Sequence, residues 1–202
     1  MAGHTEESTV RAFIALEIPE AVRGSLLRLQ QQLRAGGLRA RWVRPENVHL
    51  TVRFLGDIPL GVIPPVCSAL EGAADGLKAP ELQVANLGVF PNLRRARVIW
   101  AGLGGQVDGL NKIKARVDAC LQTVDRRLFP IENRRFRAHL TLGRFRKPVE
   151  EGLAAALKEP AGDDPLPFFA KTLALLRSEL KPGGPVYTPL GRWTLQGAGQ
   201  GH

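Results

Sequence analysis

The segment NVHLTVRFLG, from Asn47 to Gly56, places a histidine and a threonine two positions apart inside an apolar run. The segment RAHLTLGRF, from Arg137 to Phe145, repeats this His-x-Thr pattern in the second half of the chain. Apolar residues at alternate positions, bounded by turn-forming residues, are typical of β-strands. We therefore predict two strands that each carry a histidine and a threonine.

The first predicted strand has one polar and one apolar face, because side chains along a strand alternate between its two sides. This alternation puts His49, Thr51 and Arg53 together on one face. The opposite face receives three apolar side chains, Leu50, Val52 and Phe54. The polar face is a candidate catalytic surface.

The second predicted strand divides in the same way. Arg137, His139 and Thr141 share one face, and Gly143 continues this row without a side chain. A single His-x-Thr triplet is common on the solvated face of a sheet. Two matched triplets, placed about half the chain length apart, instead indicate a site that both halves of the chain build together.

The surrounding periodicity predicts strands and helices that are interleaved in small groups. Predicted helices begin at Pro19, Leu60, Val107 and Pro148, and predicted strands lie at residues 11–18, 39–43, 81–90, 96–103, 167–180 and 185–193. This order lacks the regular alternation of a parallel doubly wound sheet. We expect an α+β fold of two similar, mainly antiparallel lobes around a central cleft, packed as one unit over residues 1–202.

The composition favours a folded protein with an anionic partner. With 202 residues, of which 44% are hydrophobic, the chain is long enough to bury a core. Its formal net charge of +9 favours nucleic acid above other partners, although compositional bias towards arginine also produces a basic chain. The start of the chain has no secretion signal and no segment is long and apolar enough to span a membrane, so we expect a cytoplasmic protein.

Three further features suggest no additional chemistry. Cys67 and Cys120 form no Cys-x-x-Cys pair and are predicted to be core thiols. The run GLGG, from Gly102 to Gly105, lacks the full phosphate-loop pattern and is predicted to be a turn. Neither His-x-Thr triplet contains a carboxylate or a thiolate, so we expect no metal and no other cofactor.

Two imidazoles on facing strands suit phosphodiester hydrolysis. Histidine exchanges protons near neutral pH, so one ring can activate water while the other protonates the leaving oxygen. The threonine hydroxyls can donate hydrogen bonds to the phosphate oxygens on which negative charge accumulates. Residue pattern alone does not assign which histidine is the acid and which is the base.

Longer stretches of the chain resemble a known family. They are RAFIALEIP (residues 11–19), RWVRPENVHLTVRFLGDI (41–58), FPNLRRARVIWAGL (90–103) and LLRSELKPGGPVYTPLGRW (175–193). With the two His-x-Thr motifs, they are similar in content and order to the two-histidine phosphoesterases. Within that superfamily they resemble the RNA 2′,3′-cyclic phosphodiesterases, LigT-like proteins formerly called 2′-5′ RNA ligases. Ala138 stands where this family commonly has proline.

The resemblance implies a pseudo-two-fold α+β fold and metal-independent opening of a terminal 2′,3′-cyclic phosphate to a 2′-phosphate. It implies that His49 donates a proton to the 3′ oxygen, that His139 accepts one from water, and that Thr51 and Thr141 contact the phosphate. Further substrate-binding candidates are Phe13, Arg53, Arg137 and Arg144, although an aromatic residue in an apolar strand such as Phe13 more often packs in the core. The expected substrate is RNA or a nucleotide with a cyclic end, bound by a monomer that needs neither a membrane nor a protein partner.

Three other functions remain open at this point. The same site run in reverse would join a cyclic phosphate end to a 5′-hydroxyl and act as a 2′-5′ RNA ligase. A general endoribonuclease also uses paired histidines. A non-catalytic RNA-binding module would keep the basic surface, although the presence of both histidines argues against it.

Overall fold

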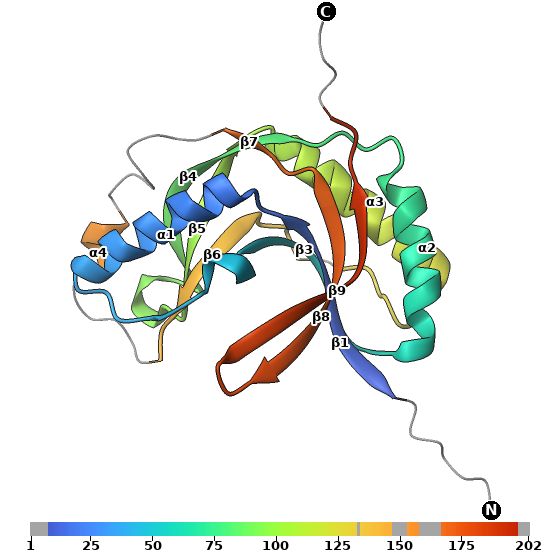
Figure 1. Ribbon diagram of the computed structural model, residues 1–202, viewed down its shortest axis with the longest axis horizontal. Helices are drawn as coiled ribbons and strands as arrows, with labels where there is room; N and C mark the ends of the chain where they lie inside the picture. The colour runs from blue at the N-terminus through green and yellow to red at the C-terminus, as the bar shows by residue number, and fades with distance from the viewer. Residues whose placement is uncertain (1–7, 133, 147–152, 158–166, 198–202) are drawn as a thin grey trace, which may run out of the picture.

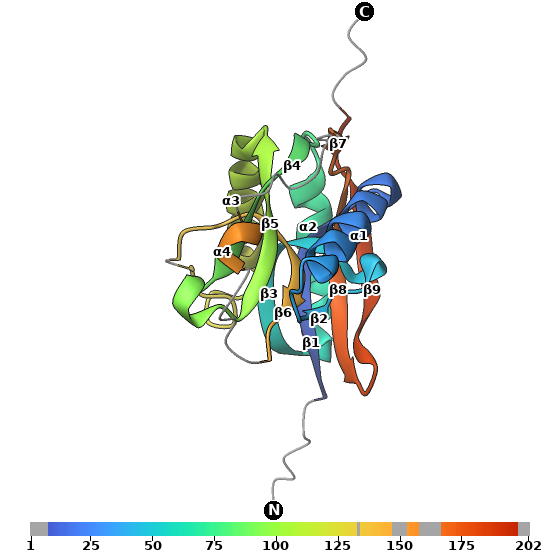
Figure 2. The same ribbon diagram turned by 90° about the vertical axis from the view of Figure 1, so that its left-hand side faces the viewer.

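The computed structural model describes residues 8–132, 134–146, 153–157 and 167–197. The strands curl into an arch, and the helices lie along its outer side, with α1 and α3 apart in both views (Figures 1 and 2). The strands are β1 (Thr9–Glu17), β2 (Arg41–Trp42), β3 (His49–Pro59), β4 (Glu81–Phe90), β5 (Val98–Gly105), β6 (His139–Arg144), β7 (Phe168–Phe169), β8 (Thr172–Lys181) and β9 (Gly184–Thr194). The α-helices are α1 (Glu20–Ala35), α2 (Ile63–Ala74), α3 (Val107–Val124) and α4 (Leu153–Ala156), and the 3-10 helices are η1 (Pro45–Asn47), η2 (Leu60–Val62) and η3 (Leu93–Arg95).

The strands form one sheet in the order β7-β4-β5-β6-β3-β1-β8-β9, and β2 pairs with β6. All pairings between these named strands are antiparallel. The predicted α+β class is confirmed. The two similar sheets expected from the sequence are halves of this sheet, and they meet where Leu50 of β3 pairs with Leu140 of β6. The two motif strands are therefore neighbours at the centre of the arch.

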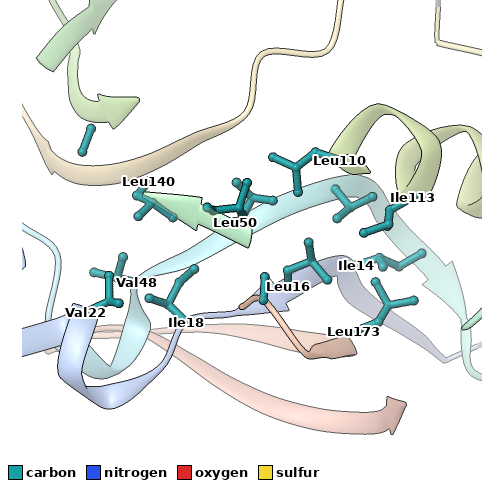
Figure 3. Packing of buried hydrophobic residues seen from close by; sticks show 14 of the residues in the cluster. Ile14, Leu16, Ile18, Val22, Val48, Leu50, Leu110, Ile113, Leu140 and Leu173 are labelled. Atoms are coloured by element: carbon teal, nitrogen blue, oxygen red, sulfur yellow. The ribbon is translucent and has the colours of Figure 1, made fainter. Parts of the chain in front are cut away.

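One face of the sheet packs against the helices and forms the main core. Leu50 and Leu140 are fully buried there, and Figure 3 shows them among side chains of α1 and α3. Burying a leucine side chain contributes roughly 1.5 to 3 kcal/mol to folding. The hydrophobic effect thus fixes which face of each motif strand turns inward. His49 and His139 are consequently displayed on the opposite face of the sheet.

The helices largely follow the predicted periodicity. Helix α1 buries Val22, Leu26 and Leu29 along one face and is followed by Gly37, whose φ of +88° reverses the chain direction. The predicted helix from Pro148 falls partly outside the described residues, and Leu153–Ala156 is the part that the structure describes. In the part of the chain that is described, no helix has the length and apolar composition that crossing a bilayer requires.

One predicted strand is interrupted in the structure. Residues 167–180 form β7 and β8, which are separated at Ala170 and Lys171 and pair with different neighbours, β4 and β1. Strand β8 continues into β9 through a long hairpin whose far end diverges from β1 (Figure 1). This hairpin brings Tyr187 of β9 towards the face that carries the histidines.

Candidate active site

The pairing of β3 with β6 brings the two His-x-Thr motifs side by side. Because the strands run in opposite directions about the Leu50 and Leu140 pair, each histidine lies beside the threonine of the other motif. The histidines are diagonal neighbours, a relation that separates side chains by about 7 to 8 Å on a sheet. That spacing leaves room for a phosphate group between them. The four motif side chains on this face are His49, Thr51, His139 and Thr141.

Each imidazole is held by the same backbone contact. The Nδ1 atom of His49 lies 2.8 Å from the carbonyl oxygen of Asn47, and Nδ1 of His139 lies 2.8 Å from that of Arg137. A carbonyl only accepts hydrogen bonds, so Nδ1 carries the proton in both rings and Nε2 is the atom left to exchange one. The Asn47 amide in turn donates to the carbonyl of Pro185 at 2.9 Å, which fixes the loop before β3.

His49 is enclosed by aromatic rings. Its ring centroid lies 4.7 Å from that of Phe13 and 5.1 Å from that of Tyr187. Burial lowers the pKa of His49 to about 4, and the positive charges of His139 and Arg144 act in the same direction. The neutral imidazole is therefore the dominant form of His49 at pH 7.

His139 has a matching aromatic environment from the other half of the sheet. Its ring centroid lies 4.9 Å from that of Phe90 and 6.1 Å from that of Trp100. Gly88 makes space for this arrangement, because an added Cβ there would overlap the Trp100 ring. Burial lowers the pKa of His139 as well, and Arg144 adds to the effect.

Charged side chains border the pair. Arg144 at the end of β6 is close enough to lower the pKa of both histidines, and its backbone pairs with that of Arg41 in β2. Glu17 lies opposite His49 on β1, where its carboxylate contacts Arg192 at 2.8 Å. Positive charge therefore accumulates at the Arg144 end of the site.

A β-bulge after the first motif reverses the predicted side-chain alternation. Thr51 pairs with Ala15, whereas Arg53 pairs with Ile14, so Val52 is an extra residue without a partner. Beyond the bulge, Arg53 turns to the core face and Phe54 turns to the face of the histidines. The prediction that Arg53 shares a face with His49 and Thr51 was therefore wrong.

The second motif has a bulge at the equivalent position. Thr141 pairs with Trp100 and Gly143 with Ile99, which leaves Leu142 as the extra residue. A Cβ added to Gly143 would point towards apolar side chains, Ala40, Trp42 and Ile99. The prediction that Gly143 continues the polar row is therefore wrong, because this position faces the core. The next residue, Arg144, lies on the histidine face instead.

Arg53 belongs to a charged cluster behind the site. Its guanidinium donates to the carbonyl of Pro130 at 2.5 Å and lies 2.8 Å from the carboxylate of Glu132 and 3.7 Å from that of Asp118. Lys114 pairs with both carboxylates. Arg53 is 6% exposed. Its contacts connect β3 to α3 and to the loop that leads into β6.

The remaining predicted residues divide between the site and its surroundings. Phe13 lies on the histidine face but is 3% exposed, so its main contacts are with other side chains, including the His49 ring. The Arg137 side chain is exposed before β6, and its carbonyl holds His139. Sequence reasoning did not identify Phe90, Trp100 and Tyr187, because their contacts with the histidines join distant parts of the chain.

The structure also tests the predictions made for the glycine run and for the cysteines. Gly102 to Gly105 lie within β5, where Gly102 is opposite His139, so the predicted turn over GLGG was wrong. Gly105 ends the strand with a φ of +84°. Cys67 and Cys120 are partly buried and pack against the core, and burial raises the pKa of the Cys120 thiol to about 11. Among the described residues, no three His, Cys, Asp or Glu side chains cluster as metal ligands.

Comparison with known proteins places this arrangement in a family. A model of the family described as LigT like phosphoesterase matches residues 16–100. The RNA 2′,3′-cyclic phosphodiesterase of Thermus thermophilus is 33% identical over 194 residues, covering 93% of this chain and 91% of that protein. The chain belongs to the LigT-like phosphoesterases. The RNA 2′,3′-cyclic phosphodiesterase of Methanothermobacter thermautotrophicus is 30% identical over 182 residues, which cover 90% of this LigT-like chain and 96% of that protein.

Solved structures agree with this membership in the LigT-like family. The crystal structure of the Thermus thermophilus protein TT0787 matches with a TM-score of 0.78 and 30% identity, over 94% of this chain and all of that one. The structure of Escherichia coli LigT complexed with 3′-AMP matches with a TM-score of 0.69 and 25% identity, over 93% and 99% of the two chains. The family resemblance and the fold expected from the sequence are confirmed.

Proposed function

We propose that this LigT-like phosphoesterase opens a terminal RNA 2′,3′-cyclic phosphate to a 2′-phosphomonoester by acid-base catalysis with His49 and His139. Membership of the family supports a phosphoesterase activity, and the cyclic phosphodiester in RNA is inferred from the names of the relatives. The observation that carries the mechanism is the matched pair of imidazoles. Both are anchored through Nδ1 and lie on one face of adjoining strands.

The proposed reaction uses both Nε2 atoms. Nε2 of His139 removes a proton from water, whose oxygen attacks the phosphorus. The bond between phosphorus and the 3′ oxygen breaks, and Nε2 of His49 donates a proton to that oxygen, which leaves the phosphate on the 2′ oxygen. The hydroxyls of Thr51 and Thr141 donate hydrogen bonds to the non-bridging oxygens, and the positive charge of Arg144 stabilises the transition state.

The proton directions follow the family resemblance, and burial imposes a condition on them. In the free protein His49 has a pKa of about 4, so it must gain its proton when the anionic phosphate binds. An aryl phosphodiester with a nitrophenolate leaving group tests the assignment, because such a group departs without an acid. With this substrate, a variant without the acid His49 should keep most of the wild-type turnover, whereas a variant without the base His139 should not.

The pH dependence should reflect the lowered pKa values. One protonated and one neutral imidazole coexist best between the two pKa values of the pair, both of which lie below 6.5 in the free protein. We expect kcat/KM, which reports the free protein, to be bell-shaped with its maximum below pH 6.5. Bound phosphate raises both pKa values, so the kcat maximum should lie at higher pH. A flat kcat/KM from pH 5 to 9, with chemistry rate-limiting, would contradict paired acid-base histidines.

Activity is expected to be independent of divalent metals. The His-x-Thr triplets supply two imidazoles and no carboxylate or thiolate, a donor set too small for a catalytic zinc site. Turnover should therefore survive incubation with EDTA and should not rise when Mg²⁺, Mn²⁺ or Zn²⁺ is added. If EDTA abolishes turnover and one metal restores it, a metallophosphoesterase mechanism replaces the present one.

The proposed function is tested by the identity of the product. Purified protein incubated with a nucleoside 2′,3′-cyclic phosphate should release the 2′-monophosphate, separated from the 3′ isomer by chromatography against standards. Release of the 3′-monophosphate would show that the leaving oxygen was assigned wrongly. Ligation opens the same cyclic phosphate with a 5′-hydroxyl in place of water and breaks the same bond to the 3′ oxygen, so a ligase should also hydrolyse this substrate when no 5′-hydroxyl acceptor is present.

A further inference from the structure

The end of the β8–β9 hairpin has no strand beside it. Strand β8 pairs with β1 only as far as Arg177, whereas its pairing with β9 continues to Lys181. Within the described part of the chain, the strand residues in 178–187 therefore pair only with each other, and this end of the hairpin diverges from the sheet (Figure 1). A two-stranded hairpin is at best marginally stable alone in water. The position of this end must therefore depend on contacts outside the sheet.

Two hydrogen bonds join the end of the hairpin to the residues before β3. The guanidinium of Arg44 donates to the carbonyl of Gly183 at 3.2 Å, and the side-chain amide of Asn47 donates to the carbonyl of Pro185 at 2.9 Å. Arg44 precedes η1, and Asn47 is the last residue of η1. A single 3-10 turn has poor hydrogen-bond geometry and holds its own shape weakly. The hairpin and η1 thus support each other.

Asn47 also contacts the catalytic pair through its backbone. Its carbonyl accepts the hydrogen bond from Nδ1 of His49 at 2.8 Å. Arg137 holds the equivalent place before His139, but its side chain is exposed and makes no hydrogen bond to any residue that the structure describes. The two anchors therefore differ in the described part of the chain, because a side chain ties only that of His49 to a distant segment.

We propose that Asn47 is a positioning residue for His49, through which the end of the β8–β9 hairpin sets the direction of the imidazole. This inference rests on the proposed function for the step that His49 performs. The side-chain amide of Asn47 fixes the angle of its own carbonyl, and Tyr187 of the same hairpin packs against the imidazole. Nε2 of His49 is then aimed at the phosphate between the histidines. Without the amide the carbonyl can rotate, and Nε2 meets the 3′ oxygen in a poorer geometry.

The kinetic test replaces Asn47 with leucine, which has nearly the same size and lacks the amide. Displacing a reacting group by about 1 Å can cost about 100-fold, so kcat/KM for a 2′,3′-cyclic phosphate should fall by about 10- to 100-fold. The nitrophenyl phosphodiester needs no acid, so its turnover should fall by less than about threefold. Arg44→Leu removes only the other hydrogen bond and should show the same preference with a smaller loss.

Nitrogen NMR of the imidazoles separates positioning from general damage. At pH 7 the neutral His49 ring should carry its proton on Nδ1 in the wild type, and the form protonated at Nε2 should appear in Asn47→Leu. His139 should keep its Nδ1 proton in both proteins, because the carbonyl of Arg137 still accepts it. The two signals are assigned from their loss in His49→Ala and His139→Ala.

Arg177→Ala is the matched control on the same hairpin, since Arg177 is exposed and pairs with Glu179 at 3.0 Å. It should leave both turnovers and both imidazole forms unchanged. An unchanged His49 ring in Asn47→Leu, or no loss with either substrate, would overturn the positioning role, and so would equal loss of both substrates where His49→Ala is rescued. If the nitrophenyl substrate does not rescue His49→Ala, the acid assigned in the proposed function is wrong, and the NMR result still decides the role of Asn47.

Discussion

Replacing either His49 or His139 with alanine should lower kcat/KM for a 2′,3′-cyclic phosphate by at least about 100-fold. A positioned general acid or base typically contributes about 10² to 10⁴ to the rate. Both imidazoles are anchored through Nδ1 and project from the centre of the sheet, so neither can replace the other without moving. The double variant should lose less than the product of the single losses, because residues that act as a unit are not additive.

The measurement is steady-state hydrolysis by purified variants whose thermal unfolding matches that of the wild type. Leu27→Ala, on the outer helix, is a control that should keep wild-type turnover. A folded His49→Ala or His139→Ala variant with near-wild-type turnover would end the two-histidine mechanism. An equal loss in the Leu27 control would show that the assay reports general damage to the protein.

Replacing Arg53 with methionine should produce the second large effect, a loss of stability. Methionine keeps an apolar stem of similar length but removes the charge that compensates Glu132 and Asp118. Removing one partner of a buried ion pair typically costs about 3 to 5 kcal/mol. Lys114 still pairs with both carboxylates, so we expect the free energy of unfolding to fall by about 2 to 4 kcal/mol.

Urea denaturation of Arg53→Met beside Arg177→Ala measures this loss. Arg177 is exposed and pairs with Glu179 at 3.0 Å, so its replacement should cost less than about 1 kcal/mol. If the two variants lose the same stability, the buried cluster does not hold β3 against α3. The ion pairs of Arg53 would then contribute no more to stability than the exposed pair of Arg177.

The sequence predicts the central part of the site because the signal is repeated. Two His-x-Thr strands with apolar partners at alternate positions indicate both the core face and the histidine face, and Leu50 and Leu140 bury the expected side. The helices are also predictable, since apolar spacing and flanking glycine or proline mark them. The family resemblance adds the expected reaction and the pseudo-two-fold fold.

The predicted alternation of side chains between the two faces of each motif strand is wrong from the residue after the threonine onward. The extra residues of the bulges, Val52 and Leu142, are aliphatic, so they look like ordinary strand residues. A bulge depends on pairing with a neighbouring strand, which local sequence does not specify. For this reason Arg53 was expected in the site and Phe54 in the core, whereas the structure has them the other way round.

The aromatic partners of the histidines are a second feature beyond local sequence. Tyr187 comes from the β8–β9 hairpin and Phe90 and Trp100 come from β4 and β5, far in sequence from the rings that they enclose. Only the order of strands in the sheet brings them together. These rings bury the imidazoles, and this burial is the main cause of the lowered pKa values.

The most direct test of the central claim uses a labelled RNA oligonucleotide with internal linkages, a 2′,3′-cyclic phosphate end and an added 5′-hydroxyl acceptor strand. In the presence of EDTA, the wild-type protein should convert the end to a 2′-phosphate at full length, and His49→Ala and His139→Ala should leave it cyclic. Internal fragments would indicate an endoribonuclease, mainly joined strands a ligase, and binding without conversion a non-catalytic module. Any of these three results would contradict the proposed cyclic phosphodiesterase.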